Sequence, residues 1–271
     1  LSHCLSGLSL PLRRMRRFVY DEPVTRFAVW SRRIALLALV VAGYAVVMLR
    51  SGVQDWRGAV TVGAALALVA TAGLVALVAL VLIWRNGYKG VGMAAQTLVV
   101  VALMLAVPVF YVIRGLTLPQ INDVTTDLEN PPEFSRSRAA LAAREGRVPP
   151  SADAATRERQ RQGYPAIAPI LLDQSAGEAY DLSRKAAVAI GWQIIESTAP
   201  GGRTGAGRIE AIQRTTFLRF TDDITIRIRP RAEGSRIDLR SASRIGTHDL
   251  GANARRIGRF AAEIAAQEAA K

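Results

Sequence analysis

Cysteine and histidine are nearly missing from this chain of 271 residues, which has one cysteine and two histidines. The single cysteine, Cys4, has no partner for an internal disulfide, and one thiol cannot build a thiolate metal cluster. His248 is the only histidine beyond the N-terminal segment, and the adjacent pair Asp222 and Asp223 is more typical of a turn than of a metal site. We therefore expect no metal and no cofactor.

Charged residues are absent from three long apolar runs, at 34–49, 58–84 and 91–113. Such runs are typical of membrane-spanning helices. The first run has 16 residues and covers about 24 Å, which is shorter than a hydrocarbon core of roughly 30 Å, but the flanking Arg33 and Arg50 can reach the interface. Ion paths and proton relays usually need ionisable groups within the membrane. The three runs therefore predict an anchor, or a docking surface for a membrane protein complex, rather than a transporter.

Positive charge is concentrated beside these runs. Up to residue 114 the chain has 12 basic and 3 acidic residues, whereas from residue 115 onward it has 23 and 19. This distribution is typical of membrane topology and argues against a nucleic-acid partner. Seven arginines in residues 13–33 predict that residues 1–33 are cytoplasmic, and three crossings then place the rest outside. We expect a bacterial inner-membrane protein with a periplasmic C-terminal domain and membrane lipid as a partner.

Residues 115–172 have the composition of an extended linker between the spans and the domain. Prolines stand at both ends of 118–134, which shows no helical period, and 135–163 is rich in Ala, Arg, Glu, Gln and Ser. The second of these segments is either a pair of exposed helices, at 135–144 and 151–162, or a solvated tether.

From residue 173 to 271 the pattern is that of a compact α+β domain. Helical spacing precedes Gly191, alternation predicts strands at 192–198, 208–216, 222–231 and 236–245, and a helix at 250–266 closes the domain. Short connections predict a four-stranded antiparallel meander with both helices on one face. The predicted fold class is α+β: a three-helix transmembrane bundle over 34–114, followed by a small α-β-β-β-β-α domain.

The last predicted strand has two different faces. Alternation places Ile237, Leu239, Ser241, Ser243 and Ile245 on the helix side, and arginines on the other. The arginine face is either a docking surface for an anionic headgroup, glycan or acidic partner, or a solvated face with Glu210 and Asp238 as counter-charges. The segment 119–134 is also able to cover and neutralise it. The side chains predicted to bind a ligand or partner are Arg227, Arg229, Arg240, Ser241, Ser243, Arg244, Asp249, Asn253 and Arg256.

The segment after this strand contains the residue types of a hydrolase, namely Ser243, His248 and Asp249. No glycine pattern of a nucleophile elbow surrounds the serine, and adjacent His and Asp side chains rarely orient each other. Asp249 is well placed to cap the following helix, while Gly251 and Asn253 in its first turn leave room for an anion. A binding or assembly module is therefore the first hypothesis, and a hydrolase acting on envelope lipid or glycan is the alternative.

Three stretches together resemble the DUF1499 family in its membrane-anchored bacterial form. They are I-N-D-V-T-T-D-L-E-N-P-P-E-F at 121–134, D-D-I-T-I-R-I at 222–228 and R-S-A-S-R-I-G-T-H-D-L-G-A-N-A-R-R-I at 240–257. The resemblance implies that Asp123, Thr125, Thr126 and Asp127 form a motif within the linker. It implies no activity, because the family is a domain of unknown function. The element order is also similar to helix-grip modules of outer-membrane assembly lipoproteins, a likeness of fold alone.

Overall fold

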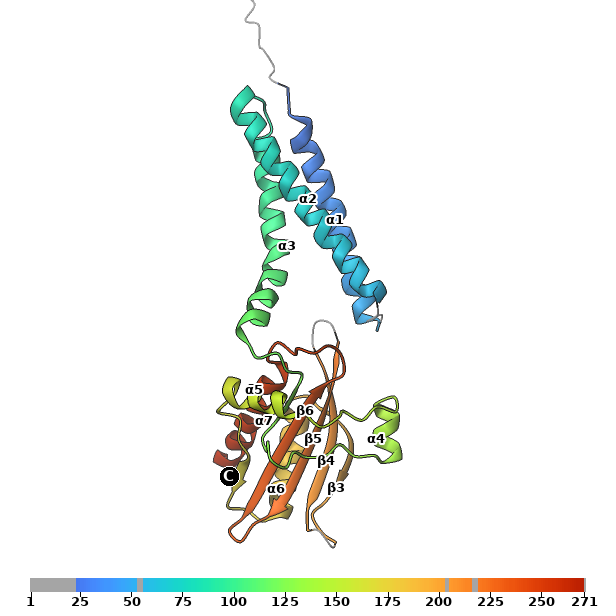
Figure 1. Cartoon of the computed structure of the whole chain (residues 1–271), viewed down its shortest axis with the longest axis vertical. Coiled ribbons are helices and arrows are strands. Elements are labelled where there is room, and N and C mark those ends of the chain that lie inside the picture. Colours follow the sequence, from blue (N-terminus) through green and yellow to red (C-terminus); the bar gives the residue numbers. More distant parts are fainter. Residues whose placement is uncertain (1–22, 53–55, 203–204, 216–218, 271) are drawn as a thin grey trace, which may run out of the picture. The chain divides into compact units, whose positions relative to one another are not determined.

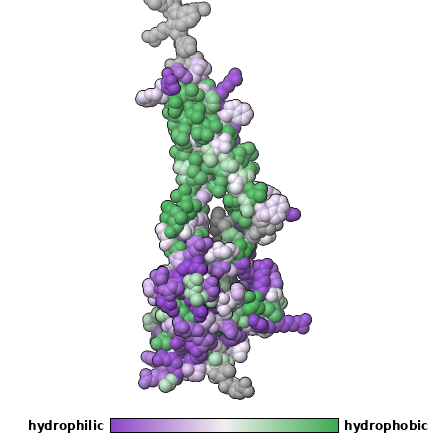
Figure 2. All heavy atoms as spheres, in the orientation of Figure 1, coloured by the Kyte–Doolittle hydropathy of each residue, from purple (hydrophilic) through white to green (hydrophobic). Residues whose placement is uncertain are grey.

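The computed structural model describes residues 23–52, 56–202, 205–215 and 219–270, so most of the predicted basic N-terminal segment lies outside the described residues. Three helices are long and apolar enough to cross a membrane: α1 (Arg26–Arg50), α2 (Trp56–Asn86) and α3 (Val91–Thr117). Figure 2 shows their hydrophobic surface. α1 has 25 residues and a length of about 37 Å, so it exceeds the apolar run from which it was predicted and is long enough for a span.

Small side chains lie where these helices meet. Ala28, Ala79 and Ala94, one from each helix, are fully buried and belong to one cluster. The hydroxyls of Ser31 and Thr97 lie 3.3 Å apart and form a hydrogen bond between α1 and α3. Small residues and interhelical hydrogen bonds are the usual means of helix association in a membrane, where apolar side chains gain little by leaving lipid.

The second part of the chain is an antiparallel sheet with helices (Figure 1). Its meander consists of β3 (Gln193–Thr198), β4 (Gly207–Arg214), β5 (Thr221–Pro230) and β6 (Ser235–Ser243), as the alternation predicts. The sheet has six strands rather than the predicted four, because β1 (Asp123–Thr125) and β2 (Ile170–Leu172) both pair with the outer edge of β6. Each has three residues, too few for a period-2 pattern, and their pairing covers an otherwise open edge.

One face of the sheet packs against α6 (Ala176–Ala189) and α7 (Ala252–Ala269), which lie behind the strands in Figure 1. Trp192 stacks on Phe260 of α7 with ring centroids 5.1 Å apart. The buried side of α7 follows helical spacing, since Phe260 and Ile264, one turn apart, are almost completely buried. The isoleucines and leucine that fill this core from β4, β5 and β6 are fully buried; they are Ile209, Ile224, Ile226, Ile228, Ile237 and Leu239.

The segment expected to be an extended linker also contains two short helices. α4 (Arg138–Ala143) begins at Ser137, whose side chain accepts from Ala140 N, and α5 (Ala154–Gly163) begins at Asp153 in the same manner. The side chain of Gln160 in α5 bonds both the N–H and the C=O of Thr125 in β1. Residues 135–163 therefore form a pair of helices rather than a solvated tether, and α5 is held against the sheet by these hydrogen bonds.

Candidate functional site

Residues 121–134, called the strap below, pair with the edge of β6 through β1 and then cross the sheet face opposite α6 and α7. At the start of the strap, the carbonyl of Asn122 accepts from Ser243 N at the end of β6 (2.8 Å). Just beyond its end, Ser135 N donates to the Glu210 carboxylate in β4 (2.9 Å). Glu210 and Asp238, expected to be counter-charges on a solvated face, are completely buried. The strap thus covers part of the arginine face and buries these two carboxylates.

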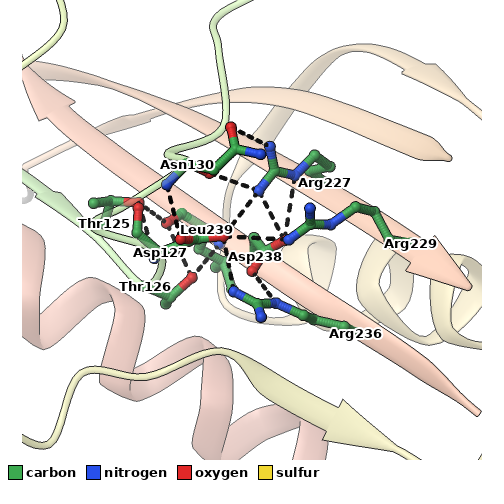
Figure 3. A network of polar contacts seen from close by, with 9 residues as sticks. All are labelled: Thr125, Thr126, Asp127, Asn130, Arg227, Arg229, Arg236, Asp238 and Leu239. Carbon is green, nitrogen blue, oxygen red and sulfur yellow. Dashed lines mark hydrogen bonds and ion pairs between the residues drawn. The ribbon is translucent and has the colours of Figure 1, made fainter. Parts of the chain in front are cut away.

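The strap brings Asp127 into a cluster of charges on β5 and β6. Arg227, Arg229 and Arg236 surround the carboxylates of Asp127 and Asp238, and these five residues are called the arginine cluster (Figure 3). Oδ2 of Asp127 lies 3.3, 3.2 and 2.8 Å from the three guanidinium groups in that order. Asp238 lies 3.0, 2.7 and 2.7 Å from the same three groups. Three cations and two anions leave one positive charge.

That charge is accessible from solvent. The side chains of Arg229 and Arg236 are 33% and 31% exposed, while Asp238 is completely buried beneath them. Within the residues that the structure describes, Nη1 of Arg229 and Nη1 of Arg236 make no hydrogen bond. Arg227 is more enclosed, because its Nη2 also donates to the carbonyl of Asn130 (2.7 Å). The cluster therefore presents guanidinium donors on a base of fixed carboxylates.

Two other arginines predicted to bind a ligand are held by internal partners. Arg240 is 3% exposed; its Nη2 lies 2.6 Å from Asp123, and its guanidinium stacks on the ring of Phe134 (5.0 Å). Burial raises the pKa of Asp123, against the opposing effect of Arg240. Arg244 is 10% exposed and bonds Asp223 (2.7 Å). Arg240 therefore belongs to the interior of the domain rather than to a docking surface.

The serines of β6 face α7 and belong to a buried polar network. Ser241 donates to the side-chain oxygen of Asn253 (2.7 Å), and Asn253 donates to Ser243 (3.0 Å). Arg256 donates to Ser241 (2.9 Å) and forms an ion pair with Asp222. Burial raises the pKa of Asp222, against the opposing effect of Arg256. These predicted binding residues satisfy one another between the sheet and the helix.

Asp249 caps α7 with both carboxylate oxygens. Oδ1 accepts from Gly251 N (2.8 Å) and Oδ2 from Asn253 N (2.7 Å). The sequence suggested that the first turn of α7 could bind an external anion, but the Asp249 carboxylate already occupies this position. Since Gly251 is in the left-handed region with φ 76°, the chain turns sharply into the helix there.

The three residue types of a hydrolase are not joined to one another. His248 Nδ1 accepts from Leu250 N (3.1 Å), and its Nε2 lies 3.3 Å from the carbonyl of Gly115. Ser243 bonds Asn253, and Asp249 bonds the backbone of α7. Among the described residues, no hydrogen bond links Ser243, His248 and Asp249.

Several residues of the site were not among the predicted binding residues. Strand alternation places Arg236 and Asp238 on the arginine face, but Asp238 was expected only as a counter-charge and Arg236 was given no binding role. No sequence pattern indicated a role for Arg144 or Phe134, because the role of each depends on its contacts with the sheet. Arg144 pairs with Glu210 although the two are 66 residues apart in sequence.

The linker motif lies in the strap. Asp123 bonds Arg240, and Asp127 bonds the three arginines of the arginine cluster. Thr125 Oγ1 donates to the carbonyl of Leu239 (3.1 Å), and Thr126 Oγ1 accepts from Leu239 N (2.8 Å). These contacts align the strap on β6.

A family model described as a protein of unknown function (DUF1499) matches residues 123–264. The matched part begins at β1, ends within α7 and contains the strap from Asp123 onward, the arginine cluster and the polar network. No curated protein and no solved structure matches the chain.

Proposed function

The chain belongs to the DUF1499 family, which by itself implies no activity. From the charges of the arginine cluster we propose that the protein is a membrane-anchored binding module that captures an anionic group there. On this proposal α1–α3 hold the protein in a bacterial inner membrane, with the N-terminus in the cytoplasm and the domain in the periplasm. The asymmetry of positive charge between the two sides of the spans supports this orientation. The domain then binds an acidic ligand or a protein partner outside the membrane.

The observation that carries the proposal is the unequal number of charges in the arginine cluster. Two carboxylates hold three guanidinium groups, so the cluster retains a positive charge, and the exposed donors of Arg229 and Arg236 face solvent. A guanidinium group offers donors in a planar fork that matches a carboxylate or a phosphate. An anion bound there would complete the neutralisation without displacing the strap.

Rigid support makes the cluster suited to binding. Arg229 and Arg236 extend from neighbouring strands at positions that pair directly in register. Asp238, fixed within β6, bonds both of their side chains. Because these bonds already hold the guanidinium groups, binding an anion costs less side-chain entropy than it would at flexible arginines.

The alternative, an envelope hydrolase, has less support. A serine hydrolase needs a base within hydrogen-bond reach of its nucleophile and a group that orients the base. Ser243, His248 and Asp249 each bond other groups, so the described geometry favours the binding module.

Native mass spectrometry of the full chain, extracted from its own membranes in mild detergent, tests the proposal. We expect a bound partner or anionic molecule with the unsubstituted protein, and its loss from the double variant Arg229→Gln/Arg236→Gln. The matched control is Arg184→Gln/Lys185→Gln, which removes the same charge from exposed positions of α6. An unsubstituted chain that carries nothing, or a control that loses the partner equally, contradicts the proposal.

A further inference from the structure

A second group of arginines lies at the other end of the sheet, and its members are called the arginine rim: Arg147, Arg214, Arg219 and Arg244. Arg214 ends β4 and pairs in register with Thr221, which begins β5. Arg244 directly follows the end of β6, whose last residue pairs with Asp222 of β5. The rim thus stands where β4 and β6 end, whereas the arginine cluster lies near the start of β6.

This end of the sheet is the one that receives the chain from α3. α3 ends at Thr117, and β1 begins six residues later at Asp123, which pairs with Ala242 near the end of β6. In the last turns of α3, the carbonyl of Gly115 lies 3.3 Å from His248 Nε2. α3 is long and apolar enough to cross a membrane, and only five residues, 118–122, separate its end from β1.

Acidic residues do not neutralise the rim. Arg214 and Arg219 are exposed and form no ion pair with any other described residue. Arg147 has only Glu145 nearby, at 3.5 Å, and both side chains are more than half exposed, so that this pair contributes little. Arg244 is paired with the buried Asp223. The four arginines of the rim therefore have two acidic partners among the described residues, Glu145 and Asp223.

We propose that the arginine rim binds the phosphate groups of anionic phospholipids in the bilayer that holds α1–α3. Guanidinium groups form bidentate bonds to phosphate, and basic clusters next to a span are attracted to acidic headgroups. Ile245, which is 44% exposed beside Arg244, adds an apolar contact for the interface. Lipid contact at the rim holds the domain against the membrane and leaves the arginine cluster, at the far end of the sheet, free for the partner. This inference concerns a different surface from the proposed function and does not depend on it.

Lipid retention by the full chain tests the proposal. The protein is reconstituted in vesicles of phosphatidylcholine and phosphatidylglycerol, extracted in mild detergent, and its bound lipids are identified by native mass spectrometry. We expect enrichment of phosphatidylglycerol over the vesicle composition. In Arg214→Gln/Arg219→Gln this preference should weaken on the order of tenfold, while Arg184→Gln/Lys185→Gln keeps it.

Either of two results overturns the proposal. A rim variant with undiminished preference would locate lipid binding elsewhere, for example at the basic ends of the helices. A loss of equal size in the α6 control would show only a response to net charge. The unsubstituted protein provides a check that does not rely on folding of the variants: raising the salt concentration should reduce the preference for phosphatidylglycerol, and a preference insensitive to salt contradicts binding at an exposed arginine rim.

Discussion

Arg144 and Glu210 form an ion pair in which neither side chain is exposed to solvent. Arg144 follows α4 and donates through Nη1 to the carbonyl of Ser135 (2.8 Å), while its guanidinium lies over the ring of Phe134 (4.9 Å). Glu210, in β4, accepts from Ser135 N and from Thr225 Oγ1, each at 2.9 Å. This pair fastens the far end of the strap to the sheet, so the strap and the end of α4 are held as part of the domain.

Removing the arginine should destabilise the domain strongly. Arg144→Met leaves the Glu210 carboxylate buried without its cation, and we expect the free energy of unfolding to fall by about 3–5 kcal/mol. The measurement is thermal unfolding of the full chain in detergent. Arg138→Met, at an exposed arginine that begins α4, serves as the control and should cost less than about 0.5 kcal/mol. Equal losses in the two variants would mean that the ion pair has no special role.

The same carboxylate should make stability depend on pH. Burial raises the pKa of Glu210 above its ordinary value of 4.5, although Arg144 acts in the opposite direction. The Glu210 carboxyl therefore binds its proton more tightly in the folded state than in the unfolded state. This difference in proton binding contributes most to the free energy of unfolding below pH 4.5, and the contribution is lost as the pH rises through the folded pKa. Glutamine does not titrate. The stability of the unsubstituted protein relative to Glu210→Gln should thus decrease as the pH is raised, and a constant or increasing difference would contradict the raised pKa.

The turn between β5 and β6 requires glycine at position 234. Gly234 has φ 78°, and a Cβ there would lie 2.0 Å from the carbonyl oxygen of Leu172 in β2. Gly234→Ala must therefore displace β2 from β6, and we expect a loss of more than about 2 kcal/mol in the free energy of unfolding. Gly202→Ala is the matched control, because Gly202 has φ 63° and nothing within 4 Å of its Cβ position. Gly202→Ala introduces the same backbone strain without the clash. A similar loss of free energy of unfolding in both variants would therefore show that the close approach of β2 contributes nothing to the effect of Gly234→Ala.

The cap of α7 should be worth a modest amount of stability. Asp249→Ala removes two hydrogen bonds to backbone N–H groups, and we expect a loss of about 1 kcal/mol with faster hydrogen exchange at Gly251 and Asn253. Asp181→Ala, an exposed position on α6, should change neither quantity. If exchange at the two amides stays slow in Asp249→Ala, the carboxylate does not hold the first turn.

The meander and its helices were predictable because burial has a local period. In β5, Ile224, Ile226 and Ile228 face the core at every second position, and in α7 the buried Phe260 and Ile264 are one helical turn apart. The three helices of membrane-spanning length were also predictable from local sequence, because a helix surrounded by lipid requires an unbroken apolar run. β1 and β2 escaped prediction, because three residues show no period and each is a strand only through its partner β6.

Strand alternation is enough to show which residues of β5 and β6 share a face, and hence that several arginines lie together. Which of these arginines remain exposed depends on contacts that form only in the folded domain. Asp127 reaches Arg236 across 109 residues of chain, and Asp123 reaches Arg240 across 117. Side-chain periodicity is a property of neighbouring residues, whereas neutralisation of a charge depends on segments that meet only after the chain has folded. For that reason a face of equivalent arginines became one buried ion pair at Arg240 and one accessible cluster around Arg229 and Arg236.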